Sequence, residues 1–565
     1  MDFKRIFLIL GLIIVGYLMI LKWNQEHQYQ IDNDKKITDA HQPHEKLNEH
    51  SHLPSANLPS DAPKAVEQSN DAPKIEVNKT QPNTVHKDLF ITAVTDNLKI
   101  KIDPYGGNIV YLALLKYPEK QGNSAPFVLL DKNERVTFIA QSGLIGENGP
   151  DAHGLPLYKA ALKNYTLRQG EKELNVDLHL EEKGVNITKR YTFTRGDYAI
   201  KLTYIINNTT QTPWSGNFYA QLKRDNSHDP DMSTTSISSY LGAAVKSNDK
   251  KFKKLKFDSF ESSPFRETVT GGYAAILQHY FVTAWVPAQN QQFVYSTRKV
   301  AGDNIVGFYG KTAVTAAPEA QAEISAKLYA GPKIGESLEK LASGLELTID
   351  YGWLWFIAAP MFAVLAFLHK LFGNWGWSII VLTTLIKLLF YPLANASYRS
   401  MARMRSLQPK MQALKERYGD DRQKMSQELM ALYKKEKVNP MGGCLPILVQ
   451  MPFFVALYEV LIEAVQLRQV PWIFWIHDLS RMDPYFILPI IMGGLMLIQQ
   501  RLNPAPPDPT QAKIMKFMPV MFTIFFLWFP AGLVIYWVTN NFLSILQQWW
   551  ITKKYEQQMA QAKKK

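Results

Sequence analysis

The last third of the chain contains a series of apolar segments, each close to the length that a lipid bilayer requires. They cover residues 375–394, 441–463, 484–501, 514–529 and 531–550. Inside lipid, every backbone N–H and C=O group must be hydrogen-bonded within the protein, so segments of this kind are restricted to helices. We therefore predict an α-helical transmembrane bundle with a five-helix core, which constrains the fold more than any other feature.

A further apolar run, from Ile6 to Leu21, follows the basic residues Lys4 and Arg5. The end of this run lacks the small-residue pattern of a cleaved signal peptide, so we predict an uncleaved transmembrane anchor over 1–23. Basic residues stay on the cytoplasmic side, which places the amino terminus in the cytoplasm and brings the number of spans to six.

The apolar stretch at 353–372 is also long enough to cross a bilayer. If it did, the strongly basic segment 397–438 would lie outside, against the positive-inside rule. We therefore predict that 353–372 lies along the outer surface as an interfacial helix, interrupted by Pro360. Both termini are then cytoplasmic, which agrees with the basic tail at 551–565 and accounts for part of the net charge of +13.

The region between the anchor and the apolar segments divides into two parts. Residues 24–86 are rich in polar residues and proline, which predicts a disordered linker on the exported side; a metal site at its histidines is the alternative. Residues 87–345 contain short alternating stretches such as ELNVDLHLEE, which predict a large all-β sandwich domain. Cys444 is the single cysteine, so no intrachain disulfide supports this domain.

The basic segment 397–438 has the pattern of a cytoplasmic helical hairpin. Gly419 predicts the end of a first helix, and Asp420 or Asp421 predicts the start of a second. Apolar residues recur at helical spacing in the first helix: Met401, Met404, Leu407, Met411 and Leu414. Two interpretations stay open, a self-packed pair of helices or a soft surface that meets varied hydrophobic segments.

One charged residue, Lys387, lies near the middle of the first apolar segment of the bundle. An ammonium at that depth costs about 2.5 to 3.5 kcal/mol on insertion scales, so it needs water or a partner. Other polar residues of the predicted spans are concentrated in the cytoplasmic half: Thr383, Gln450, Tyr536, Asn540 and Ser544. We therefore predict a hydrated, positively charged groove that opens to the cytoplasm, rather than a channel, which needs a polar path through both leaflets. Extension of Lys387 to the lipid headgroups is the alternative.

Apolar side chains next to this groove are candidates for contact with an incoming hydrophobic segment. They are Met451 and Phe454 on 441–463, and Phe525 and Phe526 on 514–529. For each of them, ordinary packing within the bundle or against lipid is the alternative.

Long segments of the apolar half closely resemble the YidC/Oxa family of bacterial inner-membrane insertases, in its Gram-negative form. The matching stretches include MARMRSLQPKMQALKERYGDDRQKMSQELMALYKKEKVNPMGGCLPILVQMPFFVALYEVL and KIMKFMPVMFTIFFLWFPAGLVIYWVTNNFLSILQQ. The resemblance implies a periplasmic β-supersandwich similar to sugar-binding domains, and an insertase core over 346–565. It also implies that the groove carries a basic residue at Lys387, where the family usually has arginine.

The resemblance implies partners as well: nascent membrane proteins, the Sec translocon SecYEG with SecDF, and ribosomes that meet the hairpin and the basic tail. A topology signal is the alternative for the tail. We expect a membrane protein insertase and chaperone of the inner membrane, acting alone or with the Sec machinery. It is not expected to be an enzyme or to need a cofactor.

Two other classes of protein compete with this expectation. A secondary transporter with its site at Lys387 is the first, but no internal repeat relates the two halves of 375–550. A glycan-binding protein with a passive membrane anchor is the second, and it leaves the polar residues of the spans unexplained.

Overall fold

A computed structural model describes most of the chain after the predicted linker. The described residues are 89–231, 240–248, 251–418, 421–436, 438, 445–503 and 509–562. The predicted anchor at 1–23 and linker at 24–86, with its histidines, lie outside them. All described residues belong to a single compact unit of the chain.

The alternating sequences form antiparallel strands whose burial has the same period of two. In strand β9 (Val185–Thr194), every second residue is buried and the residues between are partly or fully exposed. This strand pairs with β10 (Ala199–Asn208), and Phe193 lies opposite Ile200. Side chains on one face of each strand thus enter a common apolar core, which confirms the predicted large β domain.

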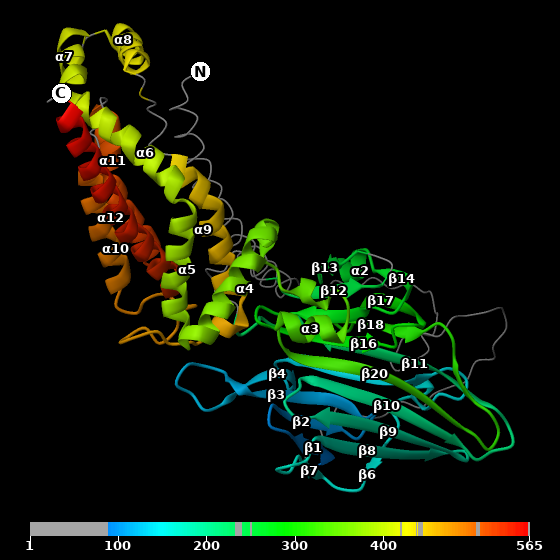
Figure 1. Cartoon of the computed structure of the whole chain (residues 1–565). Helices are drawn as coiled ribbons and strands as arrows, with labels where there is room; N and C mark the ends of the chain where they lie inside the picture. Colours follow the sequence, from blue (N-terminus) through cyan, green and yellow to red (C-terminus); the bar gives the residue numbers. More distant parts are fainter. Residues whose placement is uncertain are drawn as a thin grey trace, which may run out of the picture. The chain divides into compact units, whose positions relative to one another are not determined.

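The strands form two large sheets (Figure 1). The first has eleven strands in the order β14-β17-β18-β11-β5-β4-β3-β2-β1-β7, with β19 paired to β11; the second has nine, in the order β13-β12-β15-β16-β20-β10-β9-β8-β6. Their remaining bounds are β1 (Ile91–Val94), β2 (Leu98–Asp103), β3 (Asn108–Pro118), β4 (Pro126–Lys132), β5 (Thr137–Ile145), β6 (Lys159–Ala160), β7 (Asn164–Thr166), β8 (Glu173–Glu182), β11 (Trp214–Arg224), β12 (Gly242–Lys246), β13 (Lys253–Leu255), β14 (Arg266–Thr270), β15 (Tyr273–Leu277), β16 (Phe281–Pro287), β17 (Gln292–Val300), β18 (Asp303–Gly310), β19 (Val314–Ala316) and β20 (Gln321–Pro332). Short helices border the sheets at η2 (Pro150–Ala152), α2 (Ser259–Ser262), α3 (Gly335–Leu341) and η3 (Leu345–Thr348).

A buried lysine connects the two sheets. Lys189 of β9 donates from Nζ to the carbonyl oxygens of Gly106 at 2.8 Å and Ser142 at 3.0 Å. Ser142 belongs to β5 of the other sheet. The ring of Tyr204 lies 5.3 Å from the same ammonium, within the range of a cation–π interaction. Lys189 therefore links the two sheets, and it is in phase with the buried residues Ile187 and Tyr191 of the same strand.

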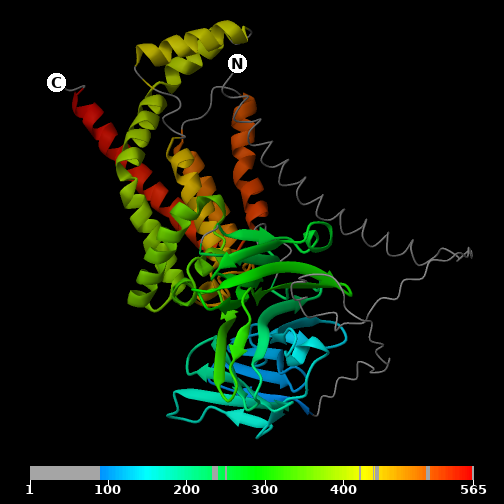
Figure 2. The same cartoon turned by 90° about the vertical axis from the view of Figure 1, so that its right-hand side faces the viewer.

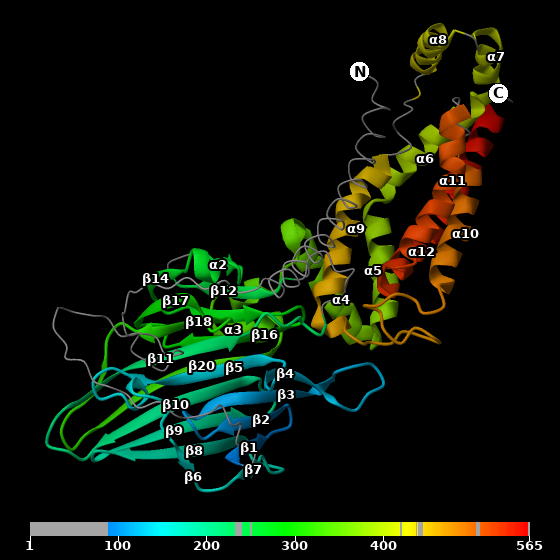
Figure 3. The ribbon, with the colours of Figure 1, turned by 180° about the vertical axis from the view of Figure 1, so that it is seen from behind.

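The apolar half is helical. Its elements are η4 (Gly352–Leu354), α4 (Trp355–Phe372), α5 (Trp375–Leu389), α6 (Tyr391–Ser406), α7 (Gln408–Tyr418), α8 (Arg422–Lys435), α9 (Leu445–Glu463), η6 (Val465–Leu467), α10 (Ile487–Leu502), α11 (Pro509–Phe526) and α12 (Ala531–Ala562). Helix α12 lies against α5 and α10, and α9 lies against α4 (Figures 1 and 3). Helix α12 ends at Ala562, well beyond the predicted span 531–550, so much of the predicted tail continues this helix.

The first predicted span of the bundle is bent at its end. Helix α5 ends at Leu389 and α6 begins at Tyr391, and the two axes differ by 67°. Pro392 lies in the first turn of α6, where proline is tolerated; if α5 continued through it, the missing N–H would cost a hydrogen bond and the ring would clash with the preceding turn. The predicted span 375–394 is therefore divided between two helices. After the bend, Tyr391 packs against a small cluster formed by Ala394, Tyr398 and Ile551.

Among the described residues, one helix is long and apolar enough to cross a membrane by itself, Gly352–Phe372. The bent pair α5 and α6 passes the same test as a broken span or a re-entrant loop, and α10 is a shorter apolar helix. Residues 352–372 are the stretch that we had placed along the outer surface. The six spans, and the surface position of this helix, therefore stay predictions.

The basic segment forms more helices than its sequence indicated. A break at Leu407, two residues before Pro409, separates α6 from α7. Helix α8 begins after Asp421, whose carboxylate accepts a hydrogen bond from the backbone N–H of Lys424 at 3.0 Å. Leu407, Met411 and Tyr433 form a small apolar cluster between α7 and α8. The two helices thus pack on each other beyond the end of α6 (Figure 2).

Candidate functional site

The strongest candidate site surrounds Lys387, two residues before the end of α5. The start of this helix is fixed by Asn374, whose side-chain oxygen accepts from the backbone N–H groups of Gly376 and Trp377. From that cap, three turns of apolar residues bring Lys387 into the bundle. Only 6% of its surface is exposed, so the side chain points into the protein and does not extend away from it.

Two other helices supply the partners of the Lys387 ammonium. Its Nζ donates to Oγ of Ser544 on α12 at 2.7 Å and to Oε1 of Gln450 on α9 at 3.4 Å. The Ser544 hydroxyl donates in turn to the carbonyl oxygen of Asn540 at 2.7 Å, which orients its lone pairs toward the lysine. Both acceptors are neutral. The positive charge of Lys387 is therefore solvated by oxygen atoms without being cancelled by them.

The structure brings together four of the six predicted groove residues: Lys387 on α5, Gln450 on α9, and Ser544 with the backbone carbonyl of Asn540 on α12. The other two predicted groove residues, Thr383 and Tyr536, make their contacts elsewhere in the bundle. The hydroxyl of Thr383 is 1% exposed and donates to the carbonyl of Ile379 in its own helix at 2.7 Å. Tyr536 is 2% exposed and packs in the apolar core of the bundle.

Three of the predicted hydrophobic contact residues have accessible surface. Met451 and Phe525 are 43% and 46% exposed. Phe454 is half-buried, and its ring centroid lies 4.9 Å from that of Trp537. Phe526 is different, because it is 2% exposed and lies in the bundle core. It cannot contact an incoming segment in this conformation, so we remove it from the contact surface.

Two buried amides on α12, those of Asn541 and Gln548, escaped the sequence prediction. Asn541 and Gln548 are 5% and 2% exposed, and Gln548 Nε2 donates to Asn503 Oδ1 at 2.9 Å. Asn541 Nδ2 and Gln547 Oε1 are buried without a hydrogen-bond partner in the described part of the chain. Two sets of α12 residues have helical spacing and include Ser544. One contains Asn540 and Gln547, and the other contains Asn541 and Gln548, so periodicity alone could not choose between these two faces.

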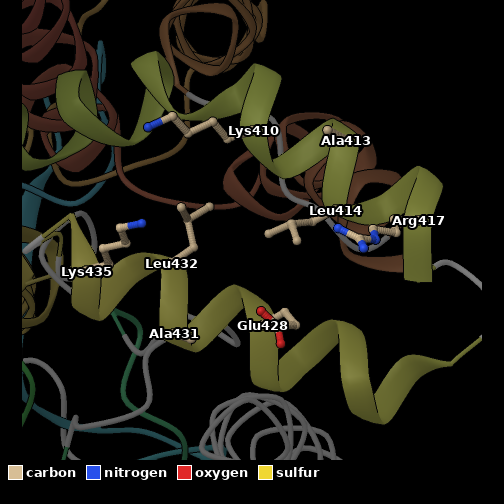
Figure 4. A pocket seen from close by; sticks show the side chains of 8 residues that line it. All are labelled: Lys410, Ala413, Leu414, Arg417, Glu428, Ala431, Leu432 and Lys435. Atoms are coloured by element: carbon tan, nitrogen blue, oxygen red, sulfur yellow. The ribbon is translucent and has the colours of Figure 1, made fainter.

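A second candidate lies in the hairpin, where α7 and α8 enclose a cavity of about 410 Å³. Figure 4 shows side chains from both helices around it. Three cations line it, Lys410, Arg417 and Lys435, with Glu428 as the one carboxylate and small or aliphatic residues between them. Lys410 also pairs with Glu436 at 2.6 Å. This is an open, basic and partly apolar surface, and it favours anionic groups.

Metal chemistry has no support in the part of the chain that the structure describes. No group of three or more histidine, cysteine, aspartate or glutamate side chains there is arranged to hold an ion. The buried polar atoms around Lys387 are amide, hydroxyl and ammonium groups. The site is therefore suited to hydrogen bonding and charge interactions.

Comparisons with known proteins agree with this division of the chain. Residues 90–364 match the family model described as YidC periplasmic domain, and residues 367–558 match the one described as 60Kd inner membrane protein. The membrane protein insertase YidC of Pseudomonas fluorescens (strain SBW25) is 53% identical over 568 residues, which cover 100% of both chains. The YidC of Stutzerimonas stutzeri (strain A1501) is 52% identical and covers 98% of this chain and 99% of its own.

A solved structure of an active YidC insertase, with the first transmembrane domain resolved, is also similar. It has 16% sequence identity and a TM-score of 0.39, and the match covers 82% of this chain and 92% of that chain.

Proposed function

The chain belongs to the YidC family of membrane protein insertases, and from this premise we propose that it inserts nascent membrane proteins at the site around Lys387. The observation that carries the proposal is the position of this ammonium between three helices. The hydrogen bonds that it donates to Gln450 and Ser544 both go to neutral oxygen atoms. Such a cation can exchange these partners for a polar or acidic group of a client.

The proposed mechanism needs no covalent step. A polar tail that must cross the membrane first enters the groove from the cytoplasm, where Lys387 and the amides of Asn541 and Gln547 provide hydrogen-bonding groups. A buried amide without a partner costs about 1 to 3 kcal/mol, so water or a client that pairs with these amides is favoured. The apolar part of the client meanwhile enters lipid along Met451, Phe454 and Phe525.

The presence of lysine rather than arginine at residue 387 limits the kind of contact that the site can make with a client. An arginine, which the resemblance gives as usual in the family, offers a planar fork for two parallel bonds to a carboxylate. Lysine is a point charge with three rotatable donors. We propose that positive charge and hydrogen-bonding capacity are sufficient at residue 387, and that a bidentate contact is not required.

The topology and partners complete the proposal. We propose six spans, both termini in the cytoplasm, and a β domain in the periplasm. On this topology the hairpin cavity and the end of α12 face the cytoplasm, where their basic residues are placed to meet ribosomes. Cooperation with SecYEG and SecDF belongs to the same proposal, and it is supported by the family resemblance alone.

Site-specific photocrosslinking during synthesis of a model client on ribosomes tests this function. A photoreactive residue at 454 or 525 should form adducts with the nascent chain. The matched control is residue 526, which is next to Phe525 but buried in the bundle core, and it should give few adducts. Equal adducts at 525 and 526, or none at 454 and 525, would contradict the proposed path of the client.

A further inference from the structure

The loop between α9 and α10, residues 464–486, contacts the β domain on one side and the helical bundle on the other. We propose that Arg468 in this loop couples the β domain to the helices that carry Lys387 and Ser544, so that a displacement of one reaches the other. The consequence at Lys387 rests on the proposed function, whereas the contact itself does not.

Arg468 is inserted into the β domain. Its side chain is 3% exposed, and Nε and Nη2 donate to the two carboxylate oxygens of Asp231 at 3.0 Å each. Nη1 and Nη2 also donate to the carbonyl oxygens of Pro118 at 2.9 Å and Glu119 at 3.3 Å. A guanidinium fork satisfied in this way is specific in its geometry, and loss of one partner leaves a buried charge uncompensated.

The surroundings of Arg468 add two further constraints. The rings of Phe127 and Phe281 lie 5.4 and 5.6 Å from its guanidinium carbon, within cation–π range. The next residue, Gln469, has a φ of 56°, in the left-handed region that residues other than glycine rarely adopt. Such a conformation persists only where its surroundings impose it, which indicates that the contact holds the loop in one shape.

A second charged contact joins the β domain to the end of α9. Glu463, the last residue of this helix, is 1% exposed. Its carboxylate lies 3.9 Å from Nζ of Lys333 and 3.7 Å from Nε2 of His279, both of which are 3% exposed. The loop is therefore attached to the β domain at its beginning as well as at Arg468.

The other side of the loop holds the amino-terminal ends of three helices. The carbonyl of Trp472 accepts from Asn374, the cap of α5, at 3.4 Å. The carbonyl of Leu479 accepts from the N–H of Gly532 at the start of α12 at 3.0 Å. Asp483 accepts from a backbone N–H in the first turn of α10 at 2.8 Å. Helices are rigid over this length, so a loop that fixes their ends also affects residues farther along them.

Hydrogen exchange of the full-length protein in lipid nanodiscs tests the contact. Arg468→Ala should accelerate exchange of the amides in 464–480 by more than about tenfold, because it leaves Asp231 buried and unpaired. Asp231→Asn should produce the same change from the opposite side. The matched control is Arg481→Ala, since Arg481 lies in the same loop but is 63% exposed and only approaches Asp478 at 3.6 Å. Equal exchange in the Arg468 and Arg481 variants would overturn the proposal.

A cysteine at position 540 reports on the other end of the coupling. With Cys444 replaced by serine, its labelling rate by a soluble maleimide should change by at least about threefold in Arg468→Ala, and not in Arg481→Ala. A loosened loop with an unchanged labelling rate would overturn the coupling. Exchange of 464–480 is measured without a client and does not depend on insertion, so a failure of the proposed insertion function is distinguishable from a failure of this inference.

Discussion

The ammonium of Lys387 lies 2.7 Å from the hydroxyl oxygen of Ser544, although 157 residues separate the two in the sequence. This contact links α5 to α12 and gives a buried cation a partner that does not neutralise it. Because the charge is retained, the site can attract a polar or acidic segment, and because it is hydrogen-bonded, the bundle tolerates it.

The charge at residue 387 is the first feature to test. We expect Lys387→Arg to preserve insertion of a short client with an acidic exported tail. Lys387→Leu should reduce it roughly tenfold, the ratio expected when a hydrogen bond to a charged group worth about 1.5 kcal/mol is lost. Lys370→Leu, which removes an exposed lysine at the end of α4, is the control. Insertion can be measured by protease protection of the client tail, and equal activity of the Arg and Leu variants would remove the charge hypothesis.

The partner of Lys387 should contribute to stability. Ser544→Ala removes the closer of the two acceptors, and we expect the free energy of unfolding to fall by about 1 to 2 kcal/mol. Thr384→Ala is the matched control, because the Thr384 hydroxyl donates only to the carbonyl of Ile380 in its own helix, at 2.9 Å. Thermal unfolding in detergent can compare the two variants. A larger effect of Thr384→Ala would argue against the interhelical contact.

Access of water to the site gives a third prediction. On a chain without Cys444, a cysteine at position 540 should react with a membrane-impermeant maleimide added from the cytoplasmic side, because a hydrated groove is proposed there. A cysteine at position 534 is the control, since Val534 is fully buried six residues earlier on α12. Protection of position 540 to the same degree as 534 would mean that the groove is closed to water.

Acidification should weaken the junction between the β domain and α9 through His279. Burial lowers the pKa of His279 from 6.5 to about 4. Its neighbours include Lys333, the Glu463 carboxylate, Asp229, which accepts from its backbone N–H at 2.6 Å, and the carbonyl of Asp231. At neutral pH the imidazole is uncharged in both the folded and the unfolded state.

Below about pH 6.5 the unfolded state binds a proton that the folded state does not. The contribution of His279 to the free energy of unfolding should therefore fall by about 1.4 kcal/mol for each pH unit between pH 6.5 and 4, and level off below pH 4. His279→Gln, which cannot be protonated, should remove this part of the pH dependence. Thermal unfolding at several pH values provides the measurement, and parallel curves for the two proteins would exclude His279 as the cause.

Local patterns predicted much of the secondary structure. Alternation of apolar and polar residues predicted strands such as β9, and Asp421 predicted the start of α8. Errors occurred where a proline interrupts an otherwise helical pattern. The predicted span 375–394 contains a bend before Pro392 that the pattern did not indicate, and the expected first helix of the hairpin is broken before Pro409. The sequence supplied the signal in both cases, but the apolar periodicity outweighed it in the prediction.

The composition of the candidate site was only partly predictable. Helical spacing indicated a polar face on α12 that includes Ser544, but it could not distinguish the face of Asn540 from that of Asn541. The same spacing marked Phe525 and Phe526 alike, and packing then exposed one and buried the other. Neighbouring residues of a helix point in directions about 100° apart, so burial depends on which elements pack around it.

The sequence by itself determined the division into a β domain and an apolar helical part, the family, and the presence of a lysine within an apolar segment. These properties depend on composition and on periodicities of two and 3.6 residues, which are local. The tertiary structure alone decided that Lys387 meets Gln450 and Ser544, and that Arg468 meets Asp231 across 237 residues. Partners so distant in the sequence are selected by the packing of whole helices and sheets, which no local pattern records.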